Sequence, residues 1–391
     1  MGDVTRLYIV RHAEAEGNIY RRAHGQCDGI LMPNGLAQLE RLAARFQGIT
    51  PEAVYASDLY RARRTALAFA RPMGLPVRTD ERLREIGLGP WEDKPWGWCG
   101  REYPQQFPAF MRKLADFRLD GAETLRQVGD RTEAAAREII ARHRGGTAVI
   151  VTHGMAIRAL LGRLLGVADE HIERIRHVDN ASLTLLRVGP DGAAEAETVG
   201  EAEYLGELST LAKQSWWRSQ EEKPDIGLWF RPADLRREAD ELVGRQRETW
   251  LRVYGVEAGF DADAALEKTR AMAAADPRCV QFVMDIDKTV GLLLLALHQS
   301  PGSMGHIALI ELDEAYCGQG LGIQPVGEAV SFYRARGRAA LRLYVHRENR
   351  RAVRFYEKSG FLKTGEKPAS HGTLDIMCRS ILPDRELNAV Q

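Results

Sequence analysis

Short apolar segments alternate with segments of helical periodicity up to about residue 205, and this alternation is the strongest constraint on the fold. Four of the apolar segments are expected to be strands: RLYIV (6–10), AVYAS (53–57), AVIVTH (148–153) and SLTLLRV (182–188). Between them, apolar residues recur at helical spacing in GLAQLERLAARF (35–46) and RARRTALAFARPMG (61–74). Such alternation predicts a layered α/β fold with a largely parallel sheet.

Two of these expected strands end on polar residues that can carry chemistry. Arg11 and His12 follow the first strand, and His153 ends the strand that begins at residue 148. In open α/β sheets, ligands bind beyond the C-terminal ends of the strands. The sequence therefore predicts a site at this edge of the sheet.

The chain is too long for one ordinary core, because domains usually contain about 100–200 residues. A second α/β pattern begins after a looser stretch that contains Trp216 and Trp217, which we expect to pack against one domain. It has two long helical segments (234–254 and 262–275), then strands, a glycine-rich turn and further helices. We predict three regions: a first domain (1–205), a linker (206–225) and a second domain (226–391).

Charge and cysteine content exclude several classes of protein. Lys+Arg and Asp+Glu are equal at 54 each, which gives no electrostatic basis for binding nucleic acid or an anionic membrane. The five cysteines are scattered without a CxxC pair, which argues against a disulfide framework and a zinc site. With no signal-peptide pattern at the N-terminus and no apolar run of membrane-spanning length, we expect a cytoplasmic protein.

Four fragments of the first half belong together chemically. They are RHAEAEGN (11–18), SDLYRARRTA (57–66), LREIGLGPWED (83–93) and VTHGMAIRALL (151–161). In this order they resemble the histidine phosphatase superfamily, which has the phosphoglycerate-mutase-like α/β/α fold. The resemblance covers roughly residues 5–190. Two positions depart from its pattern, since Ala13 replaces the glycine of the RHG motif and Ala15 replaces a threonine.

This resemblance implies a role for each charged residue of the fragments. His12 would be the nucleophile that forms a phosphohistidine, and Glu85 would protonate the leaving group and then activate water. The residues expected to bind the phosphate oxygens are Arg11, Asn18, Arg61 and His153. No metal is required in this scheme, because protein cations supply the positive charge that phosphoryl transfer needs.

The choice between hydrolase and mutase depends on the segment after Glu85. Mutases of this family carry longer insertions there, whereas the stretch 95–122 is moderate in length, which favours a phosphatase. It contains WGW and a segment with helical amphipathicity, PQQFPAFMRKLADF (104–117). Its aromatic residues either shape a specificity pocket or form the core of a lid helix.

The second half contains a strand, a turn with Gly318, Gly320 and Gly322, and then a helix. Glycines let backbone N–H groups approach a diphosphate, and a helix N-terminus adds its dipole. Together with LYVHRENRRAVRFYEKSGF (343–361), this turn resembles the GCN5-related N-acetyltransferases (GNAT), over about residues 226–383. The resemblance implies a mixed α/β domain that uses acetyl-CoA as acyl donor.

In the GNAT resemblance, Tyr356 would protonate the departing CoA thiolate and Asn349 would lie against the pantetheine or phosphate arm. Cys317 stands where the family usually has Arg or Gln, so a cationic side chain is lost. The backbone donors to the CoA pyrophosphate would come from the residues of the turn, which are Gln319, Gly320, Leu321, Gly322 and Ile323.

The general base of acyl transfer is open at this point. Glu311 and Asp313 share a face by strand alternation, and either could act through water, or both could belong to a solvated strand face. We therefore expect a bifunctional enzyme that acts on a small phosphate monoester and a small amine. The alternatives are a non-catalytic CoA-binding second domain and a phosphomutase first domain.

Overall fold

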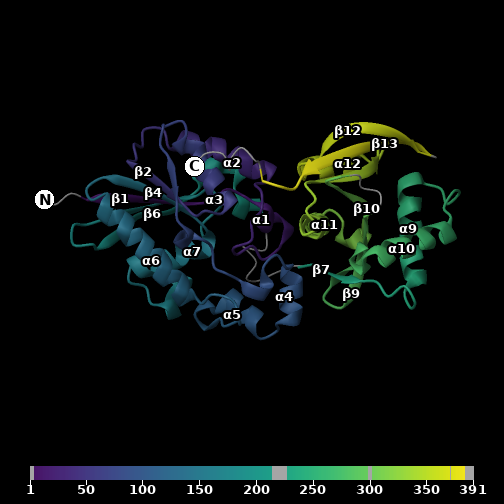
Figure 1. The fold of residues 1–391 in the computed structure, drawn as a ribbon, viewed down its shortest axis with the longest axis horizontal. Helices are drawn as coiled ribbons and strands as arrows, with labels where there is room; N and C mark the ends of the chain where they lie inside the picture. The colour runs from purple at the N-terminus through teal and green to yellow at the C-terminus, as the bar shows by residue number, and fades with distance from the viewer. Residues whose placement is uncertain (1–3, 214–226, 298–301, 370, 384–391) are drawn as a thin grey trace.

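The computed structural model describes residues 4–213, 227–297, 302–369 and 371–383, and its strands form two separate sheets (Figure 1). The first sheet has the order β3-β2-β4-β1-β5-β6, in which β3, β2, β4 and β1 are parallel to one another, β5 is antiparallel to β1, and β6 is antiparallel to β5. Its strands are β1 (Thr5–Arg11), β2 (Ala53–Ala56), β3 (Val77–Thr79), β4 (Thr147–Thr152), β5 (Leu183–Val188) and β6 (Ala194–Glu201).

The helices of the first domain cover both faces of this sheet. The α-helices are α1 (Glu16–Tyr20), α2 (Pro33–Arg45), α3 (Tyr60–Ala70), α4 (Trp96–Glu102), α5 (Gln106–Arg112), α6 (Leu125–Arg142), α7 (Gly154–Leu164) and α8 (Thr210–Lys213). Short 3-10 helices are η1 (Glu81–Leu83), η2 (Gly89–Trp91), η3 (Leu114–Asp116), η4 (Asp169–Arg174) and η5 (Glu203–Leu208).

Alternation along β1 explains the three layers of the first domain. Leu7 and Ile9 point into a core shared with α6 and α7, whereas Val10 points into a core shared with α2 and α3. All three side chains are fully buried. A parallel strand buried on both faces needs apolar residues on both, so the continuous run from residue 7 to 10 fits a central strand. The predicted α/β/α fold is confirmed.

The second sheet has the order β12-β13-β11-β10-β9-β8-β7, and only β10 and β11 are parallel to each other. Its strands are β7 (Trp229–Pro232), β8 (Val280–Asp285), β9 (Lys288–Ala296), β10 (Met304–Leu312), β11 (Ala340–His346), β12 (Leu362–Ala369) and β13 (Gly372–Ser380). The helices are α9 (Ala239–Tyr254), α10 (Ala262–Ala275), η7 (Pro277–Cys279), η8 (Glu314–Tyr316), α11 (Ile323–Arg334) and α12 (Arg350–Lys358). The predicted mixed α/β domain is confirmed.

Several sequence expectations differ from the structure in detail. The helix expected from residue 234 begins at Ala239, and the segment 104–117 is not one helix but α5 followed by η3. The paired residues Trp216 and Trp217 lie outside the described residues. Within the described ranges, none of the helices has the length and apolarity needed to cross a bilayer.

Residues after the last strand of the first sheet still contact the first domain. The Thr210 hydroxyl donates to Glu14 (2.8 Å), and the backbone N–H of Leu211 donates to Asp179 (3.1 Å). The division at residues 205 and 225 stays a prediction.

Candidate active sites

The first candidate site lies where β1 and β4 end side by side. Arg11 pairs in register with Thr152, and the backbone N–H of His12 donates to the carbonyl of Thr152 (2.9 Å). His153 follows directly as the residue before α7, and the centroids of the two imidazole rings lie 5.1 Å apart. The parallel register therefore places both predicted histidines at one point of the sheet edge.

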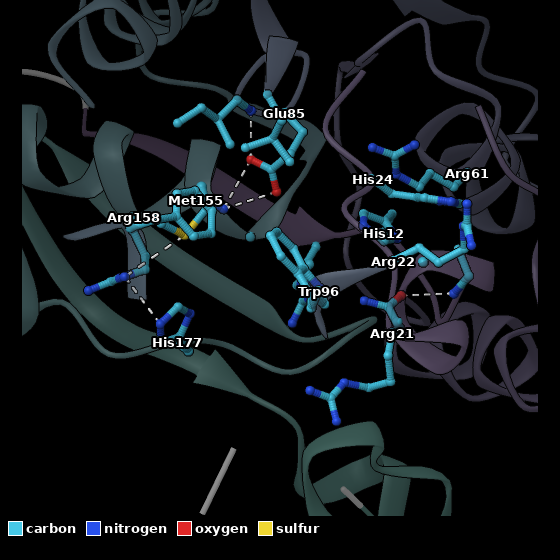
Figure 2. Close-up of a pocket in the computed structure, with 18 of the residues that line it drawn as sticks. His12, Arg21, Arg22, His24, Arg61, Glu85, Trp96, Met155, Arg158 and His177 are labelled. Carbon is cyan, nitrogen blue, oxygen red and sulfur yellow. Dashed lines mark hydrogen bonds between the residues drawn. The ribbon is translucent and has the colours of Figure 1, made fainter. Parts of the chain in front are cut away.

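Most of the predicted phosphate-site residues line one cavity of about 160 Å³ (Figure 2). His153 does not line it, and lies fully buried beside His12. The five that do are Arg11, His12, Asn18, Arg61 and Glu85.

His12 is held neutral with a defined tautomer. Burial, followed by the cations of Arg61 and Arg11, lowers the pKa of His12 well below its usual range. Its Nδ1 lies 2.8 Å from the carbonyl oxygen of Ala13. Because a carbonyl oxygen can only accept, Nδ1 carries the proton and Nε2 carries the lone pair. A neutral imidazole with a lone pair on Nε2 is the form that can attack phosphorus.

Two buried donors near His12 have no hydrogen-bond partner within the described part of the chain. Arg61 donates its Nε–H to Nδ1 of His153 (3.2 Å), so the proton of His153 lies on Nε2, and that atom is unpaired. The Nε of Arg11 is also unpaired, although its Nη1 donates to the carbonyl of Val178 (2.7 Å). Buried donors are normally paired. Arg11 lines the cavity, where an anion would meet it, whereas His153 does not line the cavity.

Arg61 contributes a positive charge to the site, and hydrogen bonds to the surrounding backbone hold its guanidinium in place. It is fully buried, and it donates to the carbonyls of Cys27 (2.9 Å) and Gly25 (2.6 Å) in addition to His153. The Oδ1 of Asn18 accepts hydrogen bonds from the backbone N–H of Ala15 (2.9 Å) and from the Nδ2 of Asn180 (3.3 Å).

Glu85 lies at the N-terminus of α7. Its carboxylate accepts the backbone N–H groups of Met155 (3.1 Å), Ala156 (3.0 Å) and Ile86 (2.9 Å) (Figure 2). Backbone donors and the helix dipole stabilise a negative charge there. This arrangement fixes the carboxylate at the cavity wall.

The outer wall of the cavity is aromatic and was only partly foreseen from the sequence. Trp96, Phe107, Phe110 and Met111 line it, and the first three pack on the fully buried Trp91 with ring centroids 5.6 to 6.3 Å away. These aromatics line the cavity and also pack on a buried core residue, and their part in specificity stays a prediction.

Charged residues that sequence reasoning missed also line the cavity. Figure 2 shows Arg158 and His177 on one side of Trp96, and Arg21 on the other. Burial and then Arg158 lower the pKa of His177 to about 3, so His177 is neutral beside that guanidinium. Arg22 and His24 also line the cavity and were not predicted from the sequence. No motif marks these residues, since each reaches the cavity only through the fold.

The two alanines that depart from the family motif fit without strain. Neither Ala13 nor Ala15 has a positive φ, and both side chains are buried with Leu39 in a small apolar cluster. The backbone N–H of Ala13 donates to Thr65 Oγ1 (2.9 Å), which anchors the loop in place.

The second candidate site is the glycine-rich turn between β10 and α11. Gly318 and Gly320 have φ of +82° and +79°, a left-handed conformation that L residues rarely adopt. Among hydrogen bonds between described residues, none uses the backbone N–H groups of 318–323 as donors. Such a run of unused donors before a helix is suited to bind a diphosphate, so the residues present fit the CoA pyrophosphate.

Helix α12 lies beside this turn and brings a cation to it. A Cβ built on Gly318 would lie 3.3 Å from Nη2 of Arg351, and one on Gly322 would lie 3.4 Å from the ring of Phe355. No described carboxylate forms an ion pair with the exposed Arg351. Arg351 therefore supplies, from a different element, the positive charge that Cys317 does not.

The other predicted residues of this site lie on α12 as well. Asn349 caps the helix, with its Oδ1 accepting from the N–H of Ala352 (3.1 Å). Tyr356 is half-buried against Phe361, and burial raises its pKa to about 12. A phenol with this pKa keeps its proton at neutral pH, as a proton donor must.

Strands β10 and β11 separate beside the turn. They pair only over Met304–Ile307 and Ala340–Leu343, and β10 has an irregularity in its pairing with β9 between Ile307 and Leu309. Beyond these pairs the two parallel strands diverge toward the turn, which leaves their facing backbone groups unpaired with each other.

The two carboxylates considered as general bases are both ion-paired. Arg245 contacts Glu311 (3.1 Å) and Asp313 (2.8 Å), and Arg252 contacts Glu311 (2.8 Å). The solvated-face alternative is wrong for Glu311, which is buried; burial raises its pKa despite the two arginines. Neither carboxylate is an unpaired base in this structure.

Comparisons with known proteins match the two halves of the chain to two different families. The model of the "Histidine phosphatase superfamily (branch 1)" matches residues 7–199, and that of the "Acetyltransferase (GNAT) family" matches residues 238–361. Two curated relatives, from Serratia proteamaculans and Yersinia pestis, are each named "Probable phosphoglycerate mutase GpmB". Each is 35% identical over 181 residues, which is 46% of this chain and 83% of the relative.

A solved structure resembles the first domain. Bacillus stearothermophilus YhfR is 30% identical with a TM-score of 0.50, and the match covers 51% of this chain and 99% of that one. Each of these matches therefore covers about half of this chain.

Proposed function

The chain belongs to the histidine phosphatase superfamily through its first domain and carries a GNAT acetyltransferase domain in its second, and from this premise we propose a bifunctional enzyme. The first domain hydrolyses phosphate monoesters through a phosphohistidine, and the second transfers an acyl group from acetyl-CoA to an amine. The observation that carries the first activity is the neutral His12, with a lone pair on Nε2, in a cavity that Arg11, Arg61 and Glu85 also line.

In the first step Nε2 of His12 forms a bond to phosphorus as the bond to the leaving oxygen breaks. Glu85, protonated at this stage, gives its proton to that oxygen. Arg11, Arg61, Asn18 and His153 hold the three phosphate oxygens through hydrogen bonds that strengthen as charge develops.

In the second step water attacks phosphorus and the bond to His12 breaks. Glu85 takes the proton of the water, which restores it for the next cycle. Its three backbone N–H contacts support this role by fixing the position of the carboxylate at the cavity wall.

The wall formed by Trp96, Phe107 and Phe110 supports an alkyl or aryl leaving group. A phosphomutase is the second candidate, and the names of the two curated relatives favour it. A hydrolase releases phosphate from a monoester, whereas a phosphomutase transfers the phosphoryl group to a second hydroxyl of the same or another molecule. Measuring the product therefore separates the two activities.

For the second domain, acetyl-CoA supplies the acyl group when bound. The N–H groups of Gln319–Ile323 and the cation of Arg351 would hold its pyrophosphate. Asn349 would lie against the pantetheine or phosphate arm, and the Tyr356 phenol would donate its proton to the departing thiolate. A CoA-binding domain without catalysis is the alternative, and it predicts binding without turnover on any amine.

We place this activity in the cytoplasm. All five cysteines are free thiols in the structure, which supports a reducing compartment.

The test is a screen of phosphate monoesters, including amine-bearing ones, for release of inorganic phosphate by the full chain. A panel of amines with acetyl-CoA is screened in parallel. We expect phosphate release that needs no second hydroxyl acceptor. Phosphoryl transfer without net release would replace the hydrolase with the mutase.

A further inference from the structure

The second domain packs directly against the loop that forms one wall of the phosphatase cavity. Helices α1 and α11 lie together at the junction of the two domains (Figure 1). Tyr20 of α1 is buried in the core of the second domain, and a Cβ on Gly327 of α11 would lie 2.5 Å from Cβ of Tyr20. Only glycine permits so close an approach, so this contact is closely fitted.

Buried charge continues this contact. Glu16 of α1 is fully buried and pairs with Arg334 of α11 (2.7 Å) and with Arg379 of β13 (3.3 Å). An unpaired buried carboxylate is costly, so the first domain relies on the second to neutralise this residue, two positions before Asn18.

The same helix reaches a residue of the cavity wall. Arg22 lines the cavity and is buried, and its Nη1 lies 2.7 Å from the carboxylate of Glu328 on α11. Its Nε lies 2.8 Å from Asp93 of the first domain. Arg22 is thus held by one carboxylate from each domain.

Asp93 in turn connects the loop to the aromatic wall. It accepts a hydrogen bond from Ser331 of α11 (2.5 Å), and it lies three residues before Trp96. The chain around it pairs with the loop, because the N–H of Trp96 donates to the carbonyl of Arg21 (3.0 Å) and that of Ala23 to the carbonyl of Lys94 (2.8 Å).

Backbone conformation at this junction is unusual. Arg21 and Asp93 have φ of +57° and +55°, the left-handed region that residues other than glycine seldom adopt. Such conformations persist when surrounding contacts enforce them. Here those contacts include Glu328 and Ser331, which belong to the second domain.

We propose that Glu328 is a positioning residue of the phosphatase site, supported by Ser331, so that the second domain completes the leaving-group side of the first domain's cavity. This inference rests on the proposed phosphatase function. Glu328 fixes Arg22 and Ser331 fixes Asp93, and together they set the separation between the loop 21–24 and the wall that begins at Trp96.

The experiment uses the full chain and two aryl monoesters of different size, phenyl phosphate and 2-naphthyl phosphate. Glu328→Gln keeps the shape and an acceptor oxygen but removes the charge, Glu328→Ala removes both, and Ser331→Ala removes the second contact. The control is Glu267→Gln, which breaks an ion pair of the same 2.7 Å length, to Arg270, on the exposed face of α10.

We expect kcat/KM for 2-naphthyl phosphate to fall about tenfold in Glu328→Gln and further in Glu328→Ala, mainly through KM. For phenyl phosphate the fall stays within about threefold, since the residues that touch phosphate are unchanged. Ser331→Ala lowers the ratio of kcat/KM for 2-naphthyl phosphate to kcat/KM for phenyl phosphate as well. Glu267→Gln leaves this ratio within twofold of wild type. A purely structural role would lower activity on both esters equally.

Each other outcome decides a different point. No phosphate release by the wild type would defeat the proposed function itself. Wild-type selectivity in folded Glu328→Gln and Ser331→Ala would overturn the inference while leaving the phosphatase intact. If Glu328→Ala fails to fold, as judged by its thermal transition, these two milder variants give the decision.

Discussion

The two candidate sites present groups of opposite kinds to the phosphates that we propose they bind. In the first domain the site consists of buried side chains, and His12, Arg11, Arg61 and His153 are all at least nine-tenths buried. In the second domain it consists of backbone N–H groups on a turn in which Gly318 and Gly320 are exposed, with the exposed Arg351 beside it. The first site therefore depends on residue identity and the second on backbone conformation.

This difference matches the chemistry expected of each site. A covalent phosphoryl transfer needs a nucleophile, cations and a proton carrier in fixed places, and burial strengthens their electrostatic effect. A CoA pyrophosphate only has to be held, and backbone donors with a helix dipole suffice. Substitutions of site side chains should therefore lower the activity of the first domain strongly and change the Kd for CoA of the second domain only slightly.

Replacement of the nucleophile is the strongest test of this contrast. His12→Ala should lower phosphatase kcat by roughly 10⁴-fold or more, because removal of a member of a covalent catalytic unit costs several orders of magnitude. Phosphate release is the measurement for this variant, and calorimetry should show unchanged CoA affinity. The exposed His171→Ala is the matched control, and full activity in His12→Ala would remove the nucleophile assignment.

The proton carrier should show a smaller effect that depends on the leaving group. Glu85→Gln is expected to slow hydrolysis of alkyl phosphates by about 10²- to 10⁴-fold, the usual scale of general acid–base catalysis. An activated aryl phosphate needs little proton donation, so its burst of alcohol release should slow much less. Equal losses in the two bursts would show that Glu85 is not the acid.

In the second domain a backbone change should matter more than a change of charge. Gly320→Ala places a Cβ at φ +79°, which costs about 1 kcal/mol and favours a different turn. We expect the Kd for CoA to rise roughly fivefold to tenfold by calorimetry. Gly337→Ala, at φ +69° after the end of α11, carries the same backbone cost away from the turn and should leave the Kd unchanged.

The smallest effect is expected for the exposed cation. Arg351→Ala should raise the Kd for CoA about threefold, because exposed charge pairs contribute only about 0.2–1 kcal/mol. The dependence of the Kd on salt should weaken in parallel. Arg354→Ala, on the same helix, is the control. A loss of a hundredfold would show that this site also depends on a side chain.

The sequence predicted the elements that carry periodic or motif information. The strands that deliver His12 and His153 were recognised from apolar runs, and the turn before α11 from its glycines. The strands β3, β6, β7, β12 and β13 were not predicted individually, because they are short or rich in polar residues.

Contacts between residues far apart in the chain could not be predicted from periodicity or motifs in the sequence. Arg351 meets Gly318, and Glu328 meets Arg22, only because two helices pack where they do. Nor did the sequence show that Arg245 binds both Glu311 and Asp313, since an arginine on a helix is most often solvated. Such pairs depend on the tertiary arrangement and not on local spacing.

The most direct test of the account is to trap the intermediate of the first domain. The full chain is mixed with a ³²P-labelled monoester, and the reaction is quenched within milliseconds in alkali. The labelled residue is then identified by peptide mapping. The account predicts an acid-labile, alkali-stable label on His12 that forms faster than phosphate appears and decays as phosphate is released to water. Steady phosphate release with no label on His12, or with a label on another residue, would contradict it.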